Sequence, residues 1–208
     1  MEKKFKLTEE TIEVGGINLH RIRALVSIGD VEAGDIGGFV EKIENLSMSG
    51  NAWVYGNAMV SGNAMVYGDA MVYGNAWVSG NAWVSGNARV SGNARVSGNA
   101  RVYGDARVSG DARVSGNAWV YGNAMVSGNA RVSGNADYIV FKNFWSSFRW
   151  FTWTRSDNMW TVGCFRGTGE ELIRKAYKDS ELSGREYERI VKYVESILTD
   201  EGKEACNE

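Results

Sequence analysis

The sequence contains no proline, one histidine and two cysteines among its 208 residues, so few side chains suited to catalysis are present. The histidine, His20, falls in a predicted hairpin, where a lone imidazole is more often structural than catalytic. No group of Cys, His, Asp and Glu residues has the spacing of a metal site. We therefore expect a protein that is not an enzyme, with no catalytic residue, no metal site and no cofactor.

Long apolar runs are also absent. No stretch approaches the roughly eighteen apolar residues of a membrane-spanning helix, and the N-terminal residues lack a cleavage-site pattern. Cys206 lies in a polar tail, which favours free thiols at Cys164 and Cys206 over a disulfide between them. These absences lead us to expect a cytoplasmic protein without a membrane partner.

One long repeat dominates what is there. Fourteen consecutive copies of the unit Gly-(Asn/Asp)-Ala-x-Val-(Tyr/Ser) run from Gly50 to Ser133. A period of six does not fit a helix, but it fits a short strand followed by a corner. Valine suits the strand, and glycine and asparagine tolerate the positive φ of a tight corner. No unit can bury its valine and alanine alone, so the units must stack.

This repeat resembles the hexapeptide-repeat family, as the stretch Val54-Tyr55-Gly56-Asn57-Ala58-Met59 illustrates. The resemblance implies a left-handed parallel β-helix with three units per coil, and the left hand rests on the resemblance alone. Residues eighteen apart in the sequence then lie in neighbouring coils. The Tyr or Ser after each valine departs from the family, where a small or acidic residue is usual. Enzymes of the family use histidines on or near the coils, and these repeats contain none.

The flanking segments predict a cap before the repeats and a small domain after them. We expect a mainly β fold with three regions: an N-terminal β cap (1–45), a left-handed parallel β-helix or solenoid (46–137), and a small α+β C-terminal domain that ends in two helices (138–208). In the cap, a hairpin turns at Gly15-Gly16. A degenerate coil follows, with apolar anchors that include Ile28 and Ile36. Met48 is expected to take the first valine position.

The C-terminal region is predicted to begin with a strand from Tyr138 to Phe141. A tryptophan-rich hairpin follows, whose second strand runs from Met159 to Phe165. The tryptophans can form the core of a small domain or an aromatic binding surface, and both interpretations stay open. Two helices follow. They begin at capping boxes formed by Thr168 with Glu171 and by Ser183 with Glu186.

The outward positions of the repeats divide into an apolar coat and an arginine belt. The apolar coat is a candidate oligomer or partner surface, formed by Trp53, Tyr55, Met71, Tyr73, Trp77 and Trp83. The candidate binding residues are the arginines of the belt and their aromatic neighbours: Arg89, Arg95, Arg101, Arg107, Arg113, Arg131, Tyr103, Trp119 and Tyr121. Arg95, Arg113 and Arg131 are predicted to stack as a ladder. Arg101 and Tyr103 are predicted to stack next to Trp119 and Tyr121 on another face.

From these positions we predict a non-enzymatic binding protein that presents Arg and aromatic ladders to a macromolecule with an acidic surface. A host protein is preferred over nucleic acid, because Asp105 and Asp111 at the corners partly neutralise the belt. One alternative is a nucleic-acid binder. Another is a self-assembling structural, scaffold or virion-associated protein that forms homo-oligomers through the apolar coat. Two further interpretations stay open. The arginine belt can be surface filler that arose by repeat duplication, and the apolar coat can pack beneath the terminal segments.

The chain as a whole resembles uncharacterised phage and prophage proteins with Gly-Asn-Ala-x-Val repeats. The resemblance rests on Ile28-Gly29-Asp30 in the cap, on the repeats, and on Val162-Gly163-Cys164-Phe165 before the capped helices. It brings no established activity. It implies a location in the cytoplasm of a bacterial host and an anti-CRISPR-like role, in which the protein inhibits a host defence factor.

Overall fold

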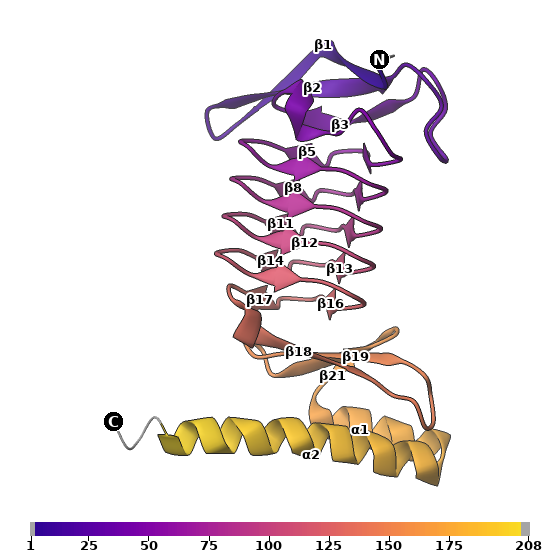
Figure 1. Ribbon diagram of the computed structural model, residues 1–208, viewed down its shortest axis with the longest axis vertical. Coiled ribbons are helices and arrows are strands. Elements are labelled where there is room, and N and C mark those ends of the chain that lie inside the picture. Colours follow the sequence, from indigo (N-terminus) through magenta and orange to yellow (C-terminus); the bar gives the residue numbers. More distant parts are fainter. Residues whose placement is uncertain (1–2, 205–208) are drawn as a thin grey trace. The chain divides into compact units, whose positions relative to one another are not determined.

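The computed structural model describes residues 3–204, with side chains through residue 199, and these form two compact units. The first unit runs through Tyr138 and includes Thr154–Asp157. The second comprises Ile139–Trp153 and the chain from Asn158 onward. Figure 1 traces the elements of each unit. Cys206, predicted as a free thiol, lies outside the described residues, and Cys164 is free and exposed.

Each repeat of the first unit contributes one short strand, made of the x residue and the valine. These strands are β4 (Trp53–Val54), β5 (Met59–Val60), β6 (Met65–Val66), β7 (Met71–Val72), β8 (Trp77–Val78), β9 (Trp83–Val84), β10 (Arg89–Val90), β11 (Arg95–Val96), β12 (Arg101–Val102), β13 (Arg107–Val108), β14 (Arg113–Val114), β15 (Trp119–Val120), β16 (Met125–Val126) and β17 (Arg131–Val132). The strand and corner assignment of the repeat is therefore confirmed.

The repeat strands stack in parallel on three faces of the described solenoid (Figure 1). We name each face by its first repeat strand. The β4 face holds β4-β7-β10-β13-β16, the β5 face holds β5-β8-β11-β14-β17, and the β6 face holds β6-β9-β12-β15. Paired residues are eighteen apart, as Arg95 with Arg113 and Arg101 with Trp119 show. The structure confirms a β-solenoid, and its left hand stays a prediction.

The inside of the coils is filled by the repeat valines and alanines, all of which are buried. Burying one valine side chain contributes about 1.5–3 kcal/mol, so stacking of successive coils carries the stability of this unit. Gly92 illustrates two reasons why the corners require glycine. Its φ is +68°, and a Cβ there would come within 2.9 Å of the backbone nitrogen of Gly110 in the next coil.

The Asn/Asp position of the repeat forms hydrogen-bonded ladders along the corners. The amide of Asn81 donates to the side-chain oxygen of Asn99, and Asn99 donates to Asn117, both at 3.1 Å. Acidic residues join the same ladders, since Asp111 accepts from the amide of Asn93 at 2.9 Å. The corner carboxylates thus take part in holding neighbouring coils together.

The N-terminal strands cover the first coils. They are β1 (Phe5–Val14), β2 (Ile17–Ala24) and β3 (Ile36–Val40). The predicted hairpin is confirmed, because β1 and β2 are antiparallel and Val14 pairs with Ile17 across the turn. Strand β3 is antiparallel to β2 and parallel to β5, with Val40 opposite Val60. The sheet thus changes from antiparallel to parallel at β3, which serves as the degenerate capping coil.

Two details of the predicted cap are wrong. Leu46, not Met48, takes the first valine position: it is buried and bridges Val66 in parallel. The Leu46 side chain, which is larger than that of valine, fills the coil interior. Met48 stays half-buried in a longer corner that follows the short helix η1 (Ile43–Asn45). Ile36, expected as an apolar anchor, lies at the start of β3 and is 47% exposed.

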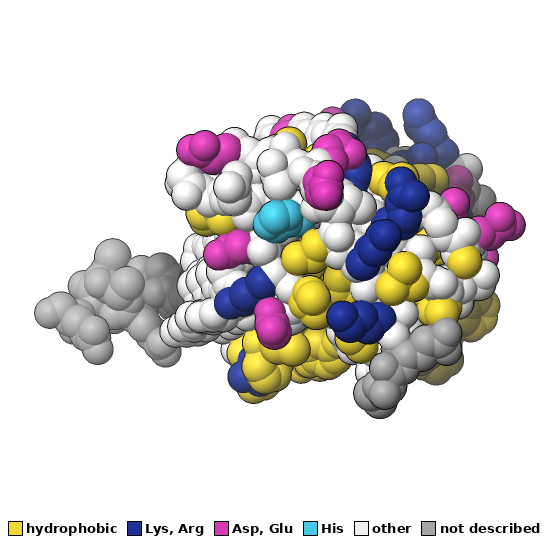
Figure 2. Space-filling view, turned by 90° about the horizontal axis from the view of Figure 1, so that it is seen from above, with side chains coloured by type: hydrophobic (Ala, Val, Ile, Leu, Met, Phe, Trp, Pro, Cys, Tyr) yellow, Lys and Arg dark blue, Asp and Glu magenta, His cyan; other side chains and the backbone are white. Residues whose placement is uncertain are grey.

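Side-chain donors satisfy backbone carbonyls at the N-terminal end of the solenoid. The amino group of buried Lys4 donates to the carbonyl oxygens of Ser47, Gly50 and Ala52, at 2.7 to 3.1 Å. The amide of Asn45 donates to those of Gly62 and Ala64. Burial lowers the pKa of Lys4 to about 8, and Asp69 opposes that shift. Figure 2 looks onto this end, where charged side chains of both signs lie among hydrophobic ones.

Side-chain acceptors satisfy backbone N–H groups at the last coil. Asn135 Oδ1 accepts from the amide of Trp119, and Ser156 Oγ accepts from that of Arg131. The carboxylate of Asp137, in the short helix η2 (Asn135–Asp137), accepts from the amides of Ser133 and Gly134. Side chains outside the repeats therefore pair strand edges that would otherwise be open.

The second unit combines a small sheet with two helices among the described residues. Its elements are β18 (Tyr138–Lys142), β19 (Trp150–Thr154), β20 (Met159–Val162), β21 (Phe165–Gly167), α1 (Gly169–Asp179) and α2 (Glu181–Glu204). The sheet order is β18-β19-β20-β21. The predicted strand from Met159 to Phe165 is wrong in one respect. It turns at Gly163, where φ is +60°, so that Val162 and Phe165 pair antiparallel.

Both helices are capped, but only one cap agrees with the prediction. Thr168 and Glu171 form the expected capping box of α1. For α2 the expected box at Ser183 is wrong, because the Ser180 hydroxyl accepts from the amide of Ser183 and the helix begins earlier. Gly184 therefore lies inside α2, where a Cβ would collide with the ring of Tyr177.

The tryptophan-rich hairpin is mostly core. Trp153 and Trp160 are buried in a cluster with side chains of α1 and α2 that includes Leu172 and Tyr187. Trp150 at the start of β19 is half-buried, and 76% of the Trp145 side chain is exposed. Of the two interpretations left open by the sequence, the domain core therefore holds for the strands, and exposed aromatic residues are left to the loop before β19.

Candidate binding groove on the solenoid

The arginine belt is distributed over different faces. Arg89 and Arg107 lie on the β4 face, and Arg101 lies on the β6 face. The β5 face carries Arg95, Arg113 and Arg131. The predicted ladder on the β5 face is confirmed, because Arg113 pairs with both Arg95 and Arg131. All six side chains are exposed, and none of them forms an ion pair within residues 3–199.

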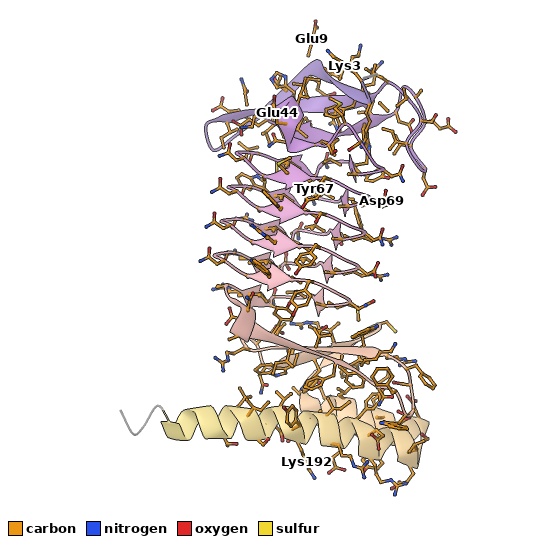
Figure 3. The ribbon with its side chains drawn as sticks, viewed as in Figure 1. Lys3, Glu9, Glu44, Tyr67, Asp69 and Lys192 are labelled. Atoms are coloured by element: carbon orange, nitrogen blue, oxygen red, sulfur yellow. The ribbon has the colours of Figure 1, made fainter. Side chains whose placement is uncertain are left out.

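A groove of about 210 Å³ lies on the β6 face. It is lined by Tyr67, Trp83, Ser85, Arg101, Tyr103 and Trp119. Two ladders of eighteen-residue spacing build it: the x residues Trp83, Arg101 and Trp119, and the residues that follow the valines. Figure 3 shows Tyr67 projecting from the coil that contains β6.

Arg101 lies between two indole rings at the centre of this groove. Its guanidinium carbon is 4.9 Å from the ring centroid of Trp83 and 5.1 Å from that of Trp119. Each cation–π contact contributes about 0.5–1 kcal/mol at an exposed site. The two contacts restrict the guanidinium while its N–H donors have no ion-pair partner among the described residues. The predicted placement of Arg101 and Trp119 together is confirmed.

Tyrosines pack along the second ladder of the groove. Tyr103 and Tyr121 stack with ring centroids 5.5 Å apart and an angle of 13° between their planes. Tyr67 contacts Trp83 edge-on, with a centroid distance of 6.1 Å. These contacts fix the orientation of the aromatic side chains before any ligand arrives.

Tyr138 supports the groove from the segment after the repeats. Its hydroxyl donates to the carbonyl oxygen of Trp119 at 2.6 Å. Burial is the main reason that the pKa of Tyr138 is raised to about 12, and a backbone hydrogen bond at Tyr121 acts in the opposite direction. The strand that carries Trp119 is thus fixed at its carbonyl by Tyr138 and at its amide by Asn135.

The groove lining has the chemistry of an anion site with apolar walls. It offers a guanidinium, two phenol hydroxyls and the Ser85 hydroxyl, and it contains no acidic side chain. A planar guanidinium matches a carboxylate or phosphate in a bidentate geometry. No described group of three or more His, Cys, Asp and Glu side chains could hold a metal ion.

The repeats match one family model. They are similar to the YdcK β-solenoid repeat, which matches residues 52–68, 64–80, 82–98, 94–109, 106–122 and 118–134. These matches support a β-solenoid repeat protein and cover less than half of the chain. A search among curated proteins gave no match. The hexapeptide-repeat and phage resemblances stay predictions.

Within the YdcK-like repeats, the predicted apolar coat does not form one surface. Trp53 is the clear correction: it is fully buried, and its ring contacts that of Phe5 edge-on at 6.3 Å, because β1 covers the first coil. Tyr55, Met71 and Trp77 are half-buried, and Tyr73 is exposed. Trp83 lies in the groove with Arg101. The structure therefore separates the coat into a covered end and side chains on different faces.

The β5 face is a weaker candidate than the groove. The guanidinium of Arg95 is 6.0 Å from the ring of Trp77, whose indole N–H donates to Ser61 Oγ at 3.0 Å. Arg113 and Arg131 have no aromatic contact among the described residues. Their guanidinium groups are therefore less restricted than that of Arg101.

Sequence reasoning missed Tyr67 and Ser85 as members of the groove. The signal was present, because 67, 85, 103 and 121 form a series with a spacing of eighteen. The prediction applied this spacing to Tyr103 and Tyr121 but did not extend the series back to Ser85 and Tyr67. Grouping the outward residues by every third repeat would have placed both residues beside Trp83 and Tyr103.

In the part of the chain with described coordinates, no helix combines the length and the apolar character that a bilayer-spanning segment requires.

Proposed function

We propose that this protein is a non-enzymatic binding protein that holds an acidic protein surface against the β6 face. The observation that carries the proposal is the position of Arg101 between Trp83 and Trp119, in a groove without acidic side chains. In this proposal Arg101 binds a carboxylate of the partner, and the indoles and tyrosines contact the apolar atoms beside it.

Restriction of the Arg101 side chain before binding favours this role. A flexible arginine loses side-chain entropy when it binds, which costs about 0.5–1.5 kcal/mol. Arg101 is already held by two rings, so less of that freedom remains to be lost. The residue types also fit, because Trp, Tyr and Arg are the types most enriched where alanine substitution weakens protein interfaces most.

The remaining arginines are assigned a long-range role. Between residues 50 and 135 there are six Arg and three Asp, so this segment carries a net charge of 6 − 3 = +3, while the whole chain carries −2. A positive segment accelerates encounter with an acidic partner and makes the association rate depend on salt. Arginines on three faces can act together in this way without touching the partner.

A protein partner is favoured over nucleic acid by the same distribution. The belt arginines lie on different faces rather than along one continuous track, and Asp105 and Asp111 lie in the corner ladders between them. The scaffold hypothesis relied on an exposed apolar coat, and Trp53 of that coat is covered by β1. Inhibition of a host defence factor is one use of such binding, and it rests on the phage resemblance alone.

The test compares two arginines of equal charge and different surroundings. Tagged wild-type protein, Arg101→Gln and the matched control Arg113→Gln are each used for pull-down from nuclease-treated bacterial lysate. We expect a captured protein whose recovery falls at least about tenfold with Arg101→Gln, which corresponds to about 1.4 kcal/mol. Recovery with Arg113→Gln should remain close to wild type.

Equal losses with the two variants would mean that charge alone matters and would contradict the groove as the binding site. Capture of nothing but the protein itself would favour the scaffold alternative. If a lysate without nuclease treatment yields a nucleic acid, and its binding depends steeply on salt concentration, the nucleic-acid alternative is favoured.

A further inference from the structure

The second unit carries a separate exposed aromatic feature, the loop 143–149 between β18 and β19 (Figure 1). Phe144, Trp145 and Phe148 are 64%, 76% and 65% exposed, the highest values among the large hydrophobic residues of the described chain. All three fall within five successive residues. Monomeric proteins rarely expose large apolar side chains in such a group without an interaction partner.

This loop is held in a defined conformation by buried Asn143. The side-chain oxygen of Asn143, which is 2% exposed, accepts from the amides of Ser146 and Ser147 and from the Ser146 hydroxyl, at 2.9 to 3.2 Å. The backbone N–H of Asn143 donates to the carbonyl oxygen of Arg149 at 3.0 Å and closes the loop. The exposure of the aromatic rings is therefore fixed by the fold.

Phe148 is held in a strained backbone conformation. Its φ is +55°, a region that residues other than glycine rarely adopt. The Lys142 amino group donates to its carbonyl oxygen at 2.6 Å, which stabilises this conformation. Strain at an exposed aromatic residue is unfavourable for folding alone, and such strain concentrates where side chains serve binding.

The charges around the loop are positive. Lys142 and Arg149 flank the aromatic residues, and the sequence from residue 138 to 154 contains no Asp or Glu. Asp179 of α1 lies near Arg149, since both line one small cavity, but they form no ion pair in the described structure. The loop therefore combines apolar rings with two cations beside them.

We propose that the loop 143–149 binds the surface of an anionic lipid bilayer. Phe144, Trp145 and Phe148 insert at the level of the headgroups, where aromatic side chains are favoured, and Lys142 and Arg149 contact lipid phosphates. A bilayer penalises unpaired backbone groups, and Asn143 and Lys142 pair several of those in this loop. The sequence-based expectation of no membrane partner rested on spanning helices and a signal peptide, and surface contact requires neither.

A bilayer is favoured over a protein pocket by these features. A protein partner would need a preformed cavity for each ring, with acidic groups placed for both cations. A lipid surface provides apolar depth and negative charge everywhere. Binding of a protein partner to this loop is the alternative that the experiment below distinguishes.

The experiment is co-sedimentation of the full-length protein with vesicles. One set is phosphatidylcholine alone, and the other contains roughly one third phosphatidylserine to supply negative charge. We compare wild type, Trp145→Ser and the control Tyr73→Ser, which removes an exposed aromatic residue of the solenoid outside the groove. We expect binding to the anionic vesicles only, reduced about tenfold or more by Trp145→Ser and unchanged by Tyr73→Ser.

Several results would overturn the proposal: wild type that binds neither vesicle, equal losses with the two variants, or a protein mass that falls with Trp145→Ser without vesicle binding. The last result would assign the loop to a second copy of the chain. Arg101→Gln should still bind vesicles, so failure of this inference and failure of the proposed groove are distinguishable.

Discussion

Single residues of the solenoid differ in their neighbours more than in their exposure. Arg101 and Arg113 are both exposed x residues of the same repeat, yet only Arg101 has an indole ring on each side within about 5 Å. The difference arises from the residues eighteen positions away, which are tryptophans for Arg101 and arginines for Arg113. Function at this scale therefore depends on stacking partners, which the single repeat unit does not reveal.

Tyr138 allows a test of the support beneath the groove. Tyr138→Phe removes the hydroxyl that donates to the Trp119 carbonyl, and we expect it to destabilise the fold by about 1 kcal/mol near pH 7. Burial raises the pKa of Tyr138 from 10.0 to about 12, so its contribution is complete below pH 10.0 and is lost as the pH rises through 12. Because the pKa shift removes about 1.4 kcal/mol of stability from the wild type at about pH 11, the free energy difference of about 1 kcal/mol between wild type and variant should disappear there.

Urea denaturation of both proteins at about pH 7 and about pH 11 measures this difference, followed by the circular dichroism of the β-structure. Comparison with the variant cancels the titration of the other tyrosines and lysines. A difference that is unchanged at the higher pH would contradict the buried hydrogen bond.

At the scale of elements, the corners determine how closely one coil approaches the next. Gly92 and Gly122 both have positive φ, near +68° and +64°, but only Gly92 has backbone of another coil where a Cβ would lie. The pair separates two reasons for glycine that the sequence alone combines. The positive φ disfavours other residues at both positions. Close approach of the backbone excludes a side chain only where another coil follows.

We expect Gly122→Ala to cost about 1–2 kcal/mol, the cost of a left-handed conformation for an alanine. Gly92→Ala should cost at least about 1 kcal/mol more, because the contact with Gly110 forces two coils apart. Urea denaturation gives both free energies of unfolding. Equal costs at the two corners would show that coil spacing adjusts freely and that only the φ angle matters.

For the whole molecule, the repeat predicted nearly all of the solenoid. The valines and alanines inside, the corners and the stacking of Arg95, Arg113 and Arg131 all follow, because each copy meets another copy of the same unit and the same backbone contacts recur. Residues that occur once were harder to place. Ser180 rather than Ser183 caps α2, because the cap depends on which serine meets the free amides once Tyr177 has packed over Gly184.

The ends of the solenoid show the same limit of prediction. Trp53 carries the pattern of an outward residue, and its burial follows from a contact with Phe5, which lies far away in the sequence. Lys4 looks like an ordinary surface lysine in the sequence, yet it is buried and satisfies carbonyl groups of the first corner. Neither role can be read from periodicity, because each is decided by a single long-range contact.

The surface charges of the solenoid should be separable from its folding. We expect the combined variant Arg95→Glu, Arg113→Glu and Arg131→Glu to keep its β-structure and to change the free energy of unfolding by less than about 1 kcal/mol. These side chains are exposed and form no ion pair among the described residues. Far-ultraviolet circular dichroism and thermal denaturation check this, and loss of the β signal would show that the side chains are not outward.

The eighteen-residue coil also limits how the chain can change in length. Insertion of three successive repeats before Tyr67 would leave every later residue on its own face, because it adds one whole coil. Removal of one repeat between Trp83 and Arg101 would instead move Trp83 to another face and separate the two. The groove therefore tolerates insertions in steps of three repeats before it, whereas duplication or loss of a single repeat within it would destroy the site while the solenoid still folds.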